Sequence, residues 1–128
     1  MTKSIAMTVA ALLMAGTMSV AQISAGGEQR TAEVAFNNAC RTCHTMKEGD
    51  NRLGPSLHGV IGRRSGSLPG YGYSESMKTA GIVWDDTTLN RFLADPEAVV
   101  PGNKMKPYGG VGDAEARAMI IAHLKAGN

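Results

Sequence analysis

The stretch Cys40-Arg41-Thr42-Cys43-His44 decides the fold of this chain. Two cysteines that are separated by two residues and followed directly by a histidine form the c-type haem attachment signature. Thiols one helical turn apart can each form a thioether with one vinyl group of a haem, and the histidine then lies beneath the ring. The motif therefore predicts one haem c, bound covalently through Cys40 and Cys43, with His44 as an axial ligand of the iron.

A redox dithiol and a structural zinc site are the alternatives for this motif. A redox Cys-x-x-Cys pair belongs in a βαβ unit, and the chain has no alternating strand pattern of any length. A structural zinc site needs four ligands. Beyond the motif only His58 and His123 remain, and neither has zinc-ligand spacing. The haem interpretation is therefore favoured over both alternatives.

The composition indicates one small domain with few large aromatic side chains for its core. The chain has 128 residues, a formal net charge of +2 and 43% apolar residues, with only two Phe, three Tyr and one Trp. This length allows a single domain, and the small charge excludes a strongly basic nucleic-acid binder. So few aromatic residues are a weak basis for a core. We expect the porphyrin to supply the missing apolar slab.

The N-terminus has the pattern of a secretory signal peptide. Lys3 precedes a short apolar run, and small residues follow near Ala21 and Ala25. This order is typical of export signals. An uncleaved membrane anchor, the alternative, needs about 20 predominantly apolar residues, and Thr, Gly and Ser interrupt this run. We therefore expect a signal peptide at residues 1–25, cleaved after Ala21 or Ala25, a single domain at residues 26–128 and a periplasmic location.

Helical periodicity and capping residues predict an all-α domain with three main helices and one shorter helix. The main helices are expected at residues 28–40, 85–95 and 113–127, and the shorter one at residues 74–79. Their expected buried side chains are Val34 and Phe36 in the first, Leu89, Phe92 and Leu93 in the second, and Met119, Ile120, Ile121 and Leu124 in the last. Long Gly- and Pro-rich loops at residues 46–73 and 95–111 are expected to wrap around the haem.

A methionine is expected as the second axial ligand of the iron. Met46 is too close in sequence to the motif histidine to reach the opposite face of the ring, and Met119 fits a core stripe. Met77, in the shorter helix, is compatible with either role. Met105 lies between two lysines in a polar loop shaped by Pro and Gly. Core packing does not explain a methionine at such a position. Met105 is therefore the predicted ligand, and His58 stays open as an alternative.

Further motifs accompany the attachment signature along the chain. They are Phe36, Gly54-Pro55-Ser56-Leu57-His58-Gly59, Gly62-Arg63, Tyr73, Gly81-Ile82-Val83-Trp84 and Pro101-Gly102-Asn103-Lys104-Met105. With them, the sequence resembles class I cytochromes c of the bacterial c2 and mitochondrial-like type over essentially all of the mature chain. The resemblance implies the small cytochrome c fold and His44 and Met105 as axial ligands. It also implies that the Pro55 carbonyl accepts from the His44 ring, and that Arg63, Tyr73 and Trp84 surround the haem propionates.

The resemblance implies a soluble, monomeric one-electron carrier that is not an enzyme. Its expected partners are membrane complexes: a donor of the quinol–cytochrome c reductase type, and an oxidase, a photosynthetic reaction centre or a reductase as acceptor. No nucleic acid is expected as a partner. The alternative is a haem enzyme or gas-binding haem protein in which Met105 leaves the iron easily, because catalysis needs an open position.

The chain departs from the family pattern at several positions. Ala32 stands where the family usually has Gly, and His123 where it usually has an aromatic residue. Near the predicted ligand, Asn103 replaces a common Thr and keeps a polar group at this position. Pro107-Tyr108 replaces the usual aromatic residue after the ligand, and Glu97 stands where relatives often have Lys.

Basic side chains around the expected haem edge favour modest steering of acidic partners. The candidates are Arg41, Lys47, Arg52, Arg63, Arg64, Lys104 and Lys106. An ordinary mixed-charge surface is the alternative, because residues 81–102 contain four acidic side chains and only one basic side chain, Arg91.

Overall fold

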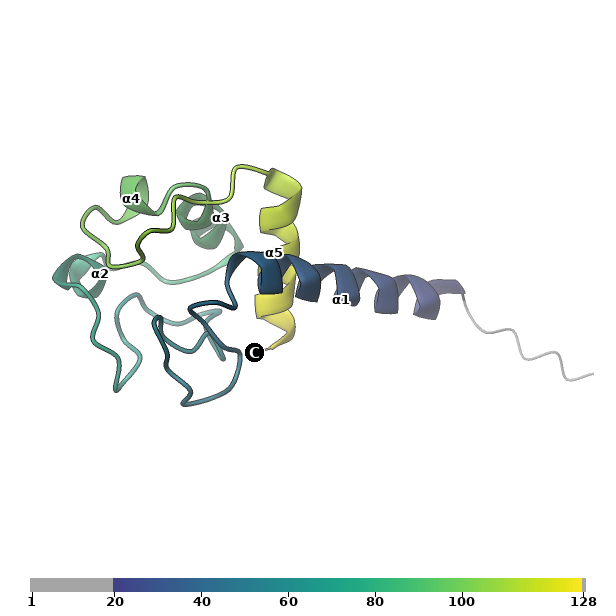
Figure 1. Cartoon of the computed structure of the whole chain (residues 1–128), viewed down its shortest axis with the longest axis horizontal. Coiled ribbons are helices and arrows are strands. Elements are labelled where there is room, and N and C mark those ends of the chain that lie inside the picture. Colours follow the sequence, from purple (N-terminus) through teal and green to yellow (C-terminus); the bar gives the residue numbers. More distant parts are fainter. Residues whose placement is uncertain (1–19, 128) are drawn as a thin grey trace, which may run out of the picture.

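The computed structural model describes residues 20–127, which form five helices joined by long loops (Figure 1). The helices are α1 Val20–Ala39, α2 Glu75–Thr79, α3 Asp86–Ala94, α4 Pro96–Val99 and α5 Ala114–Ala126. Among the described residues, β-structure is limited to one isolated antiparallel bridge between Arg64 and Val83. The predicted all-α fold class is therefore confirmed.

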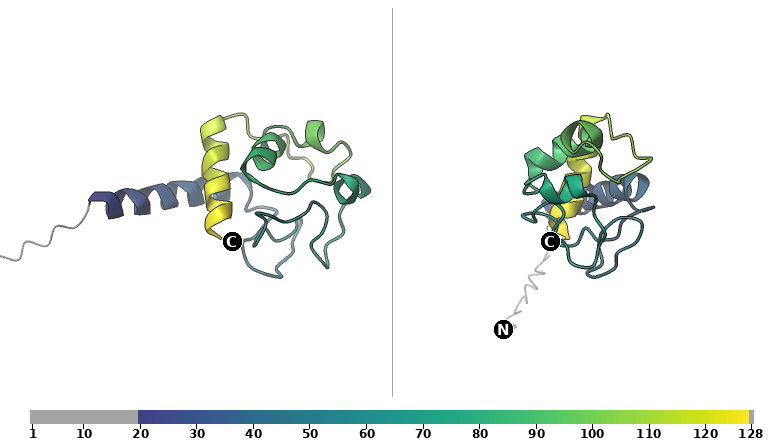
Figure 2. Two further views of the ribbon diagram at one scale, coloured as in Figure 1. Left: turned by 180° about the vertical axis from the view of Figure 1, so that it is seen from behind. Right: turned by 90° about the vertical axis from the view of Figure 1, so that its left-hand side faces the viewer.

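Helix α1 begins earlier than residue 28, where the sequence predicted it to start. Each glycine inside a helix costs only about 1 kcal/mol, so Gly26 and Gly27 do not end the helix. Its first half projects away from the other helices (Figures 1 and 2). Residues 1–19 lie outside the described residues, and α1 runs through both Ala21 and Ala25, so the signal peptide and its cleavage stay predictions. Within residues 20–127, no helix combines the length and apolarity that a membrane crossing requires.

Side-chain caps explain where three of the predicted helices begin. Ser74 accepts from the N–H of Met77 at 3.1 Å and starts α2. Asp85 forms a capping box with Thr88 at the start of α3, and Asp113 accepts from two backbone N–H groups in the first turn of α5. Such caps bind the backbone donors that a helix leaves unpaired at its N-terminus. The helices predicted at residues 74–79, 85–95 and 113–127 are all present.

Helix α4 was not predicted, because residues 95–111 were expected to be loop throughout. Pro96 ends α3, yet it is also the first residue of α4, where its missing N–H and fixed φ suit a helix start. Asp95 is the N-cap, and its side chain accepts from the N–H of Ala98 at 3.1 Å. The proline therefore separates two consecutive helices.

The core lies where α5 packs against α1 and α3. Ala32 and Phe36, four residues apart and both buried, form the inner face of α1, and Cys40, directly after the helix, continues this face. The Phe36 ring lies 4.6 Å from the ring of His123 on α5, so this histidine makes a ring contact at the position where the family usually has an aromatic residue. Ala32 is only 6% exposed, which shows that the fold accommodates its methyl group in place of the usual glycine.

The prediction that Val34 and Met119 belong to the core was wrong. Val34 is 55% exposed, because the period of the helix turns it away from the face that carries Phe36. Met119 is half-buried and does not belong to the core cluster, which α5 enters through Ile120, Ile121 and Leu124.

Gly110 fixes the end of the loop between α4 and α5 against α3. Its φ is +104°, and a Cβ atom there would collide with the carbonyl oxygen of Ala94. The next residue, Val111, donates its N–H to the carbonyl of Leu93 at 2.8 Å. This close approach of two backbones leaves no room for a side chain.

We therefore predict that Gly110→Ala lowers the free energy of unfolding by about 2–4 kcal/mol, because it adds both strain and a steric clash. Gly112→Ala is the matched control, since a Cβ at Gly112 meets nothing within 4 Å. We expect it to change stability by less than about 0.5 kcal/mol. Denaturant titration followed by circular dichroism measures both values. Equal stabilities of the two variants would contradict the packing described for Gly110.

Candidate haem-binding site

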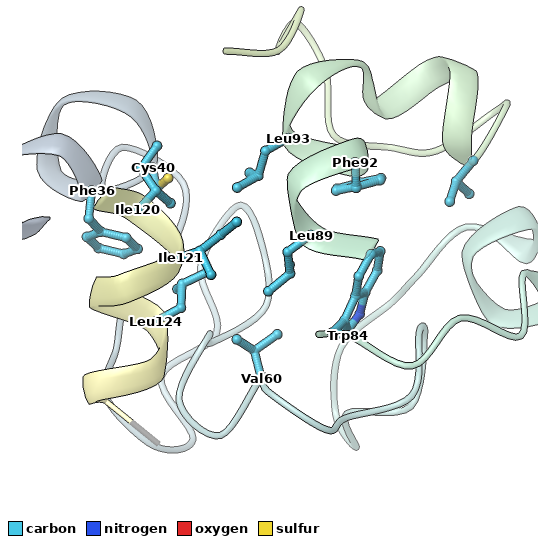
Figure 3. Close-up of a cluster of buried hydrophobic side chains, with 11 residues drawn as sticks. Phe36, Cys40, Val60, Trp84, Leu89, Phe92, Leu93, Ile120, Ile121 and Leu124 are labelled. Carbon is cyan, nitrogen blue, oxygen red and sulfur yellow. The ribbon is translucent and has the colours of Figure 1, made fainter. Parts of the chain in front are cut away.

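A cavity of ≈ 560 Å³ lies in the middle of the helices. Figure 3 shows side chains of α3 and α5, with Val60 from a loop, gathered around one space. The apolar part of the wall comes from Ala39, Leu57, Val60, Trp84, Leu89, Phe92, Leu93, Ile120 and Leu124. A mostly apolar cavity of this size is typical of small-molecule and cofactor sites.

Both cysteines of the attachment motif line the cavity, and they form no disulfide with each other. The backbone N–H of Cys43 donates to the carbonyl of Cys40 at 3.1 Å, so the motif forms a turn that follows α1 directly. Burial raises the pKa of the Cys40 thiol to about 11, and Cys43 adds to the rise. A redox dithiol normally has a lowered thiol pKa, so this environment argues against the redox alternative.

The His44 ring is held in one orientation by the loop that follows it. Nδ1 lies 2.8 Å from the carbonyl oxygen of Pro55, and because a carbonyl only accepts, Nδ1 carries the proton and donates. Burial lowers the pKa of His44, and the nearby Arg63 charge lowers it further, against the opposing effect of the Pro55 hydrogen bond. The ring is therefore held neutral, with Nε2 left as the nitrogen that a metal can bind.

Gly54 allows this loop to approach the histidine. Its N–H donates to the carbonyl of Cys43 at 2.8 Å. A Cβ atom at Gly54 would lie 2.6 Å from Nδ1 of His44, closer than real Cβ contacts come. The side chain of Ser56 donates to the carbonyl of Lys47 at 2.6 Å and ties the loop together on its other side. The contact between His44 and Pro55 thus depends on a glycine that precedes the proline.

The cavity wall contains two of the candidate methionines. Met77, from α2, and Met105, from the loop after α4, both line the cavity, whereas Met46 and Met119 do not. His58 is exposed and is not part of the wall either. The structure therefore narrows the thioether candidates to Met77 and Met105.

Asn103 supports the Met105 loop from behind and does not line the cavity. It is 3% exposed, and its amide donates to the carbonyl of Val100 at 2.9 Å. Its carbonyl oxygen accepts from the backbone N–H of Met105 at 2.9 Å. All three polar contacts of its side chain are to protein groups, including Glu97. Asn103 therefore supports the backbone of the predicted ligand, and its influence on the haem stays a prediction.

Glu97 was noted in the sequence only for its charge, yet it has several partners in this loop. Its carboxylate accepts from the N–H of Gly102 at 2.9 Å and from the amide of Asn103 at 3.2 Å. It also forms an ion pair with Lys106, 2.5 Å between Nζ and Oε2. The hydrogen bond from Lys106 is the main reason why the pKa of Glu97 is lowered.

Two buried polar atoms in the cavity wall have no protein partner. Nη2 of Arg63 donates to the carbonyl of Ser56 at 2.9 Å, but Nη1 has no acceptor. The Tyr108 hydroxyl is also unpartnered, and burial raises its pKa to about 12. Buried polar groups are almost always hydrogen-bonded in folded proteins, so both atoms point to a polar ligand in the cavity. Tyr108 was not among the predicted site residues, although an aromatic residue three positions after Met105 was a signal for it.

The predicted tyrosine and tryptophan complete this polar wall. Tyr73 lines the cavity, its ring lies 4.8 Å from that of Tyr71, and burial raises its pKa. Trp84 is 7% exposed and packs 5.0 Å from the ring of Phe92. Both therefore present a polar atom on an apolar body, as a ligand with an apolar ring and charged substituents requires.

The donors in the cavity suit haem iron. Over residues 20–127, no three His, Cys, Asp or Glu side chains are grouped to hold a metal ion, so the zinc alternative finds no support there. What the wall does offer is two thiols, one imidazole and two thioethers. Histidine with methionine is a known axial pair for haem c. The residues present therefore fit the cofactor that the motif predicts.

Comparisons with known proteins agree with this site. No family model matches the chain. Cytochrome c of Gibberella zeae is 43% identical over 102 residues, which cover 79% of this chain and 95% of the relative. Cytochrome c2 of Rhodopila globiformis is 48% identical over 90 residues, which cover 70% of this chain and 84% of the relative. The solved structure of cytochrome cH from Methylobacterium extorquens superposes with a TM-score of 0.71 at 38% identity, over 77% of this chain and 97% of that one.

Identities of this size extend over most of both chains, and they confirm the resemblance that the motifs indicated. They also agree with the two cavity-lining thiols, to which one haem c is attached in this protein, through Cys40 and Cys43. The chain belongs to the class I cytochromes c, electron carriers and not enzymes, and is related to both the mitochondrial cytochromes c and the bacterial cytochromes c2.

Proposed function

We propose that this cytochrome is an exported one-electron carrier of the periplasm, with His44 and Met105 as the axial ligands of its haem. It takes electrons from a membrane complex of the quinol–cytochrome c reductase type and delivers them to an oxidase, a photosynthetic reaction centre or a reductase. The observation that carries the proposal is a hydrogen-bonded, neutral imidazole in the same apolar cavity as the Met105 side chain.

Each ligand contributes a separate property. Haem supplies an iron that changes between the ferrous and ferric states. The hydrogen bond from His44 to Pro55 fixes the ring and makes its free nitrogen more basic. The soft sulfur of Met105 favours the ferrous state and so raises the reduction potential. Arg63, with Nη1 unpaired, together with Tyr73 and Trp84, is suited to pair with the haem propionates.

The lining of the cavity favours electron transfer over the alternative of a gas-binding protein with an open iron. In the wall formed by residues 39–124, His44 is the only histidine, and no carboxylate is present. A haem that activates small molecules usually has an acid–base group, such as a second histidine or a carboxylate, on its open side. Apolar walls and two protein ligands also keep rearrangement small when the charge of the iron changes.

The basic surface around the cavity is partly neutralised. Lys104 and Lys106 line the cavity, but Lys106 is paired with Glu97. Arg52 is similarly paired with Asp50, 3.1 Å apart. We therefore propose that steering of acidic partners is modest and comes mainly from the unpaired basic groups.

Replacement of the proposed ligand tests the axial assignment. We predict that Met105→Leu abolishes the weak far-red charge-transfer band of sulfur-bound ferric haem. Loss of the thioether also lowers the midpoint potential by about 0.1–0.3 V, part of the range of about 0.8 V that axial ligands span. Met77→Leu is the matched control, because Met77 lines the same cavity from α2, and it should leave both readouts unchanged. Loss of the band in Met77→Leu instead would assign the sulfur to Met77.

Salt dependence tests the steering proposal. We predict that the rate constant for oxidation by a small anionic oxidant falls about two- to fivefold between 10 mM and 150 mM ionic strength, because salt screens the basic groups. Lys104→Gln should make this dependence shallower. Lys125→Gln changes a lysine outside the cavity wall. In this variant the salt dependence of the rate constant should be steeper than in Lys104→Gln. A rate that is constant or rises with salt would contradict steering.

A further inference from the structure

The carboxylate of Glu97 contacts three residues that surround Met105 in sequence. Its oxygens accept from the backbone N–H of Gly102 and the side-chain amide of Asn103, and they pair with the ammonium group of Lys106. Two of these partners precede Met105 and one follows it. One side chain on α4 therefore spans the segment that carries the proposed ligand.

Helix α4 is anchored in the fold by its caps and buried ends, whereas the loop that follows it has few buried apolar side chains. Helix α4 is capped by Asp95, and both its first residue, Pro96, and its C-cap, Val100, are buried. By contrast, residues 104, 106 and 107 are exposed, and between Val100 and Val111 the apolar side chains that are not exposed are Met105 and Tyr108. Its order therefore depends on hydrogen bonds that tie it to α4.

These hydrogen bonds reach the backbone of Met105 itself. Glu97 accepts from the amide nitrogen of Asn103 at 3.2 Å, and the amide oxygen of Asn103 accepts from the N–H of Met105 at 2.9 Å. A charged acceptor strengthens the bonds that it receives. Glu97 thus fixes the orientation of the amide group that holds the proposed ligand.

The chemistry of the partners explains why an acidic residue stands at this position. Gly102, Asn103 and Lys106 all present donors, namely an amide N–H, an NH₂ group and an ammonium group. A lysine at position 97 offers only further donors and a second positive charge. The acidic residue is therefore part of the same arrangement as Asn103 and Lys106, and not an isolated change of surface charge.

We propose that Glu97 is a positioning residue, whose carboxylate ties the loop to α4 and holds the Met105 sulfur in place against competing ligands. This inference rests on the proposed axial role of Met105. It adds a residue outside the cavity wall that controls how readily the sixth position of the iron opens. Glu97 touches neither the cavity nor Met105 directly, so it acts through Asn103, Gly102 and Lys106.

The test is a titration of the ferric holoprotein with imidazole, which binds only where the methionine sulfur has left. Glu97→Ala removes the whole acceptor, and we expect imidazole affinity to rise about tenfold. Glu97→Gln keeps one acceptor for Gly102 but loses both the bond from Asn103 and the ion pair, whereas Lys106→Met loses the ion pair alone. Both should raise the affinity by about two- to fivefold. The expected order is Glu97→Ala, then the two milder variants, then the parent protein.

Asp86→Asn is the matched control. Asp86 forms an exposed ion pair with Lys125, 2.9 Å apart, at the start of α3 and away from the Met105 loop. This variant should bind imidazole within about twofold of the parent, since an exposed ion pair adds little stability. Thermal unfolding followed by circular dichroism separates the two effects, because a merely structural role for Glu97 would lower the melting temperature without a selective gain in imidazole affinity.

Two outcomes would overturn the inference, and they are distinguishable. If Glu97→Ala and Glu97→Gln bind imidazole like the parent while the parent shows the sulfur-to-iron band, Glu97 does not position Met105. If the parent itself lacks that band, the axial role of Met105 fails, and the inference fails with it. Should Glu97→Ala not yield holoprotein, Glu97→Gln and Lys106→Met provide the same comparison.

Discussion

An apolar cavity that the protein's own side chains do not fill is the constraint on which the rest of the structure depends. Its wall is formed by side chains from the end of α1, from α3 and α5 and from the long loops. These elements therefore surround the cavity, and α5 also packs directly against α1 and α3. Folded proteins rarely contain voids larger than a water molecule. The haem attached through Cys40 and Cys43 is therefore part of the core, and this explains why so few aromatic residues suffice.

The same cavity links stability to electron transfer. Groups that hold the fold together also define the surroundings of the iron: the turn after α1 carries His44, and Gly54 brings Pro55 within reach of its ring. Further along the chain, the loop after α4 has few buried apolar side chains and is held in place by polar contacts. Asn103 and Glu97 provide these contacts at its beginning, and the N–H of Val111, next to Gly110, provides one at its end. A carrier of this kind keeps its ligands in place by hydrogen bonds made outside the cavity.

The parts of the structure that could be predicted depend on local chemistry. Caps such as Asp85 and Asp113 lie next to the helices that they start, and the attachment motif needs no distant partner to be recognised. What could not be predicted depends on contacts across the fold. Val34 and Phe36 were equally plausible core residues until the packing of α5 selected one face of α1. The direction of Asn103 likewise follows from Glu97, and the unpaired hydroxyl of Tyr108 becomes visible only once the cavity is known.

The most direct test of this account is whether the polypeptide folds without its haem. Far-ultraviolet circular dichroism should be compared between the holoprotein and a Cys40→Ala, Cys43→Ala double variant from which haem is absent, in the same buffer and at the same temperature. The account predicts that the double variant retains little helical signal and unfolds without a cooperative transition, because its core lacks the largest apolar group. A compact, helical double variant with a sharp thermal transition would contradict it.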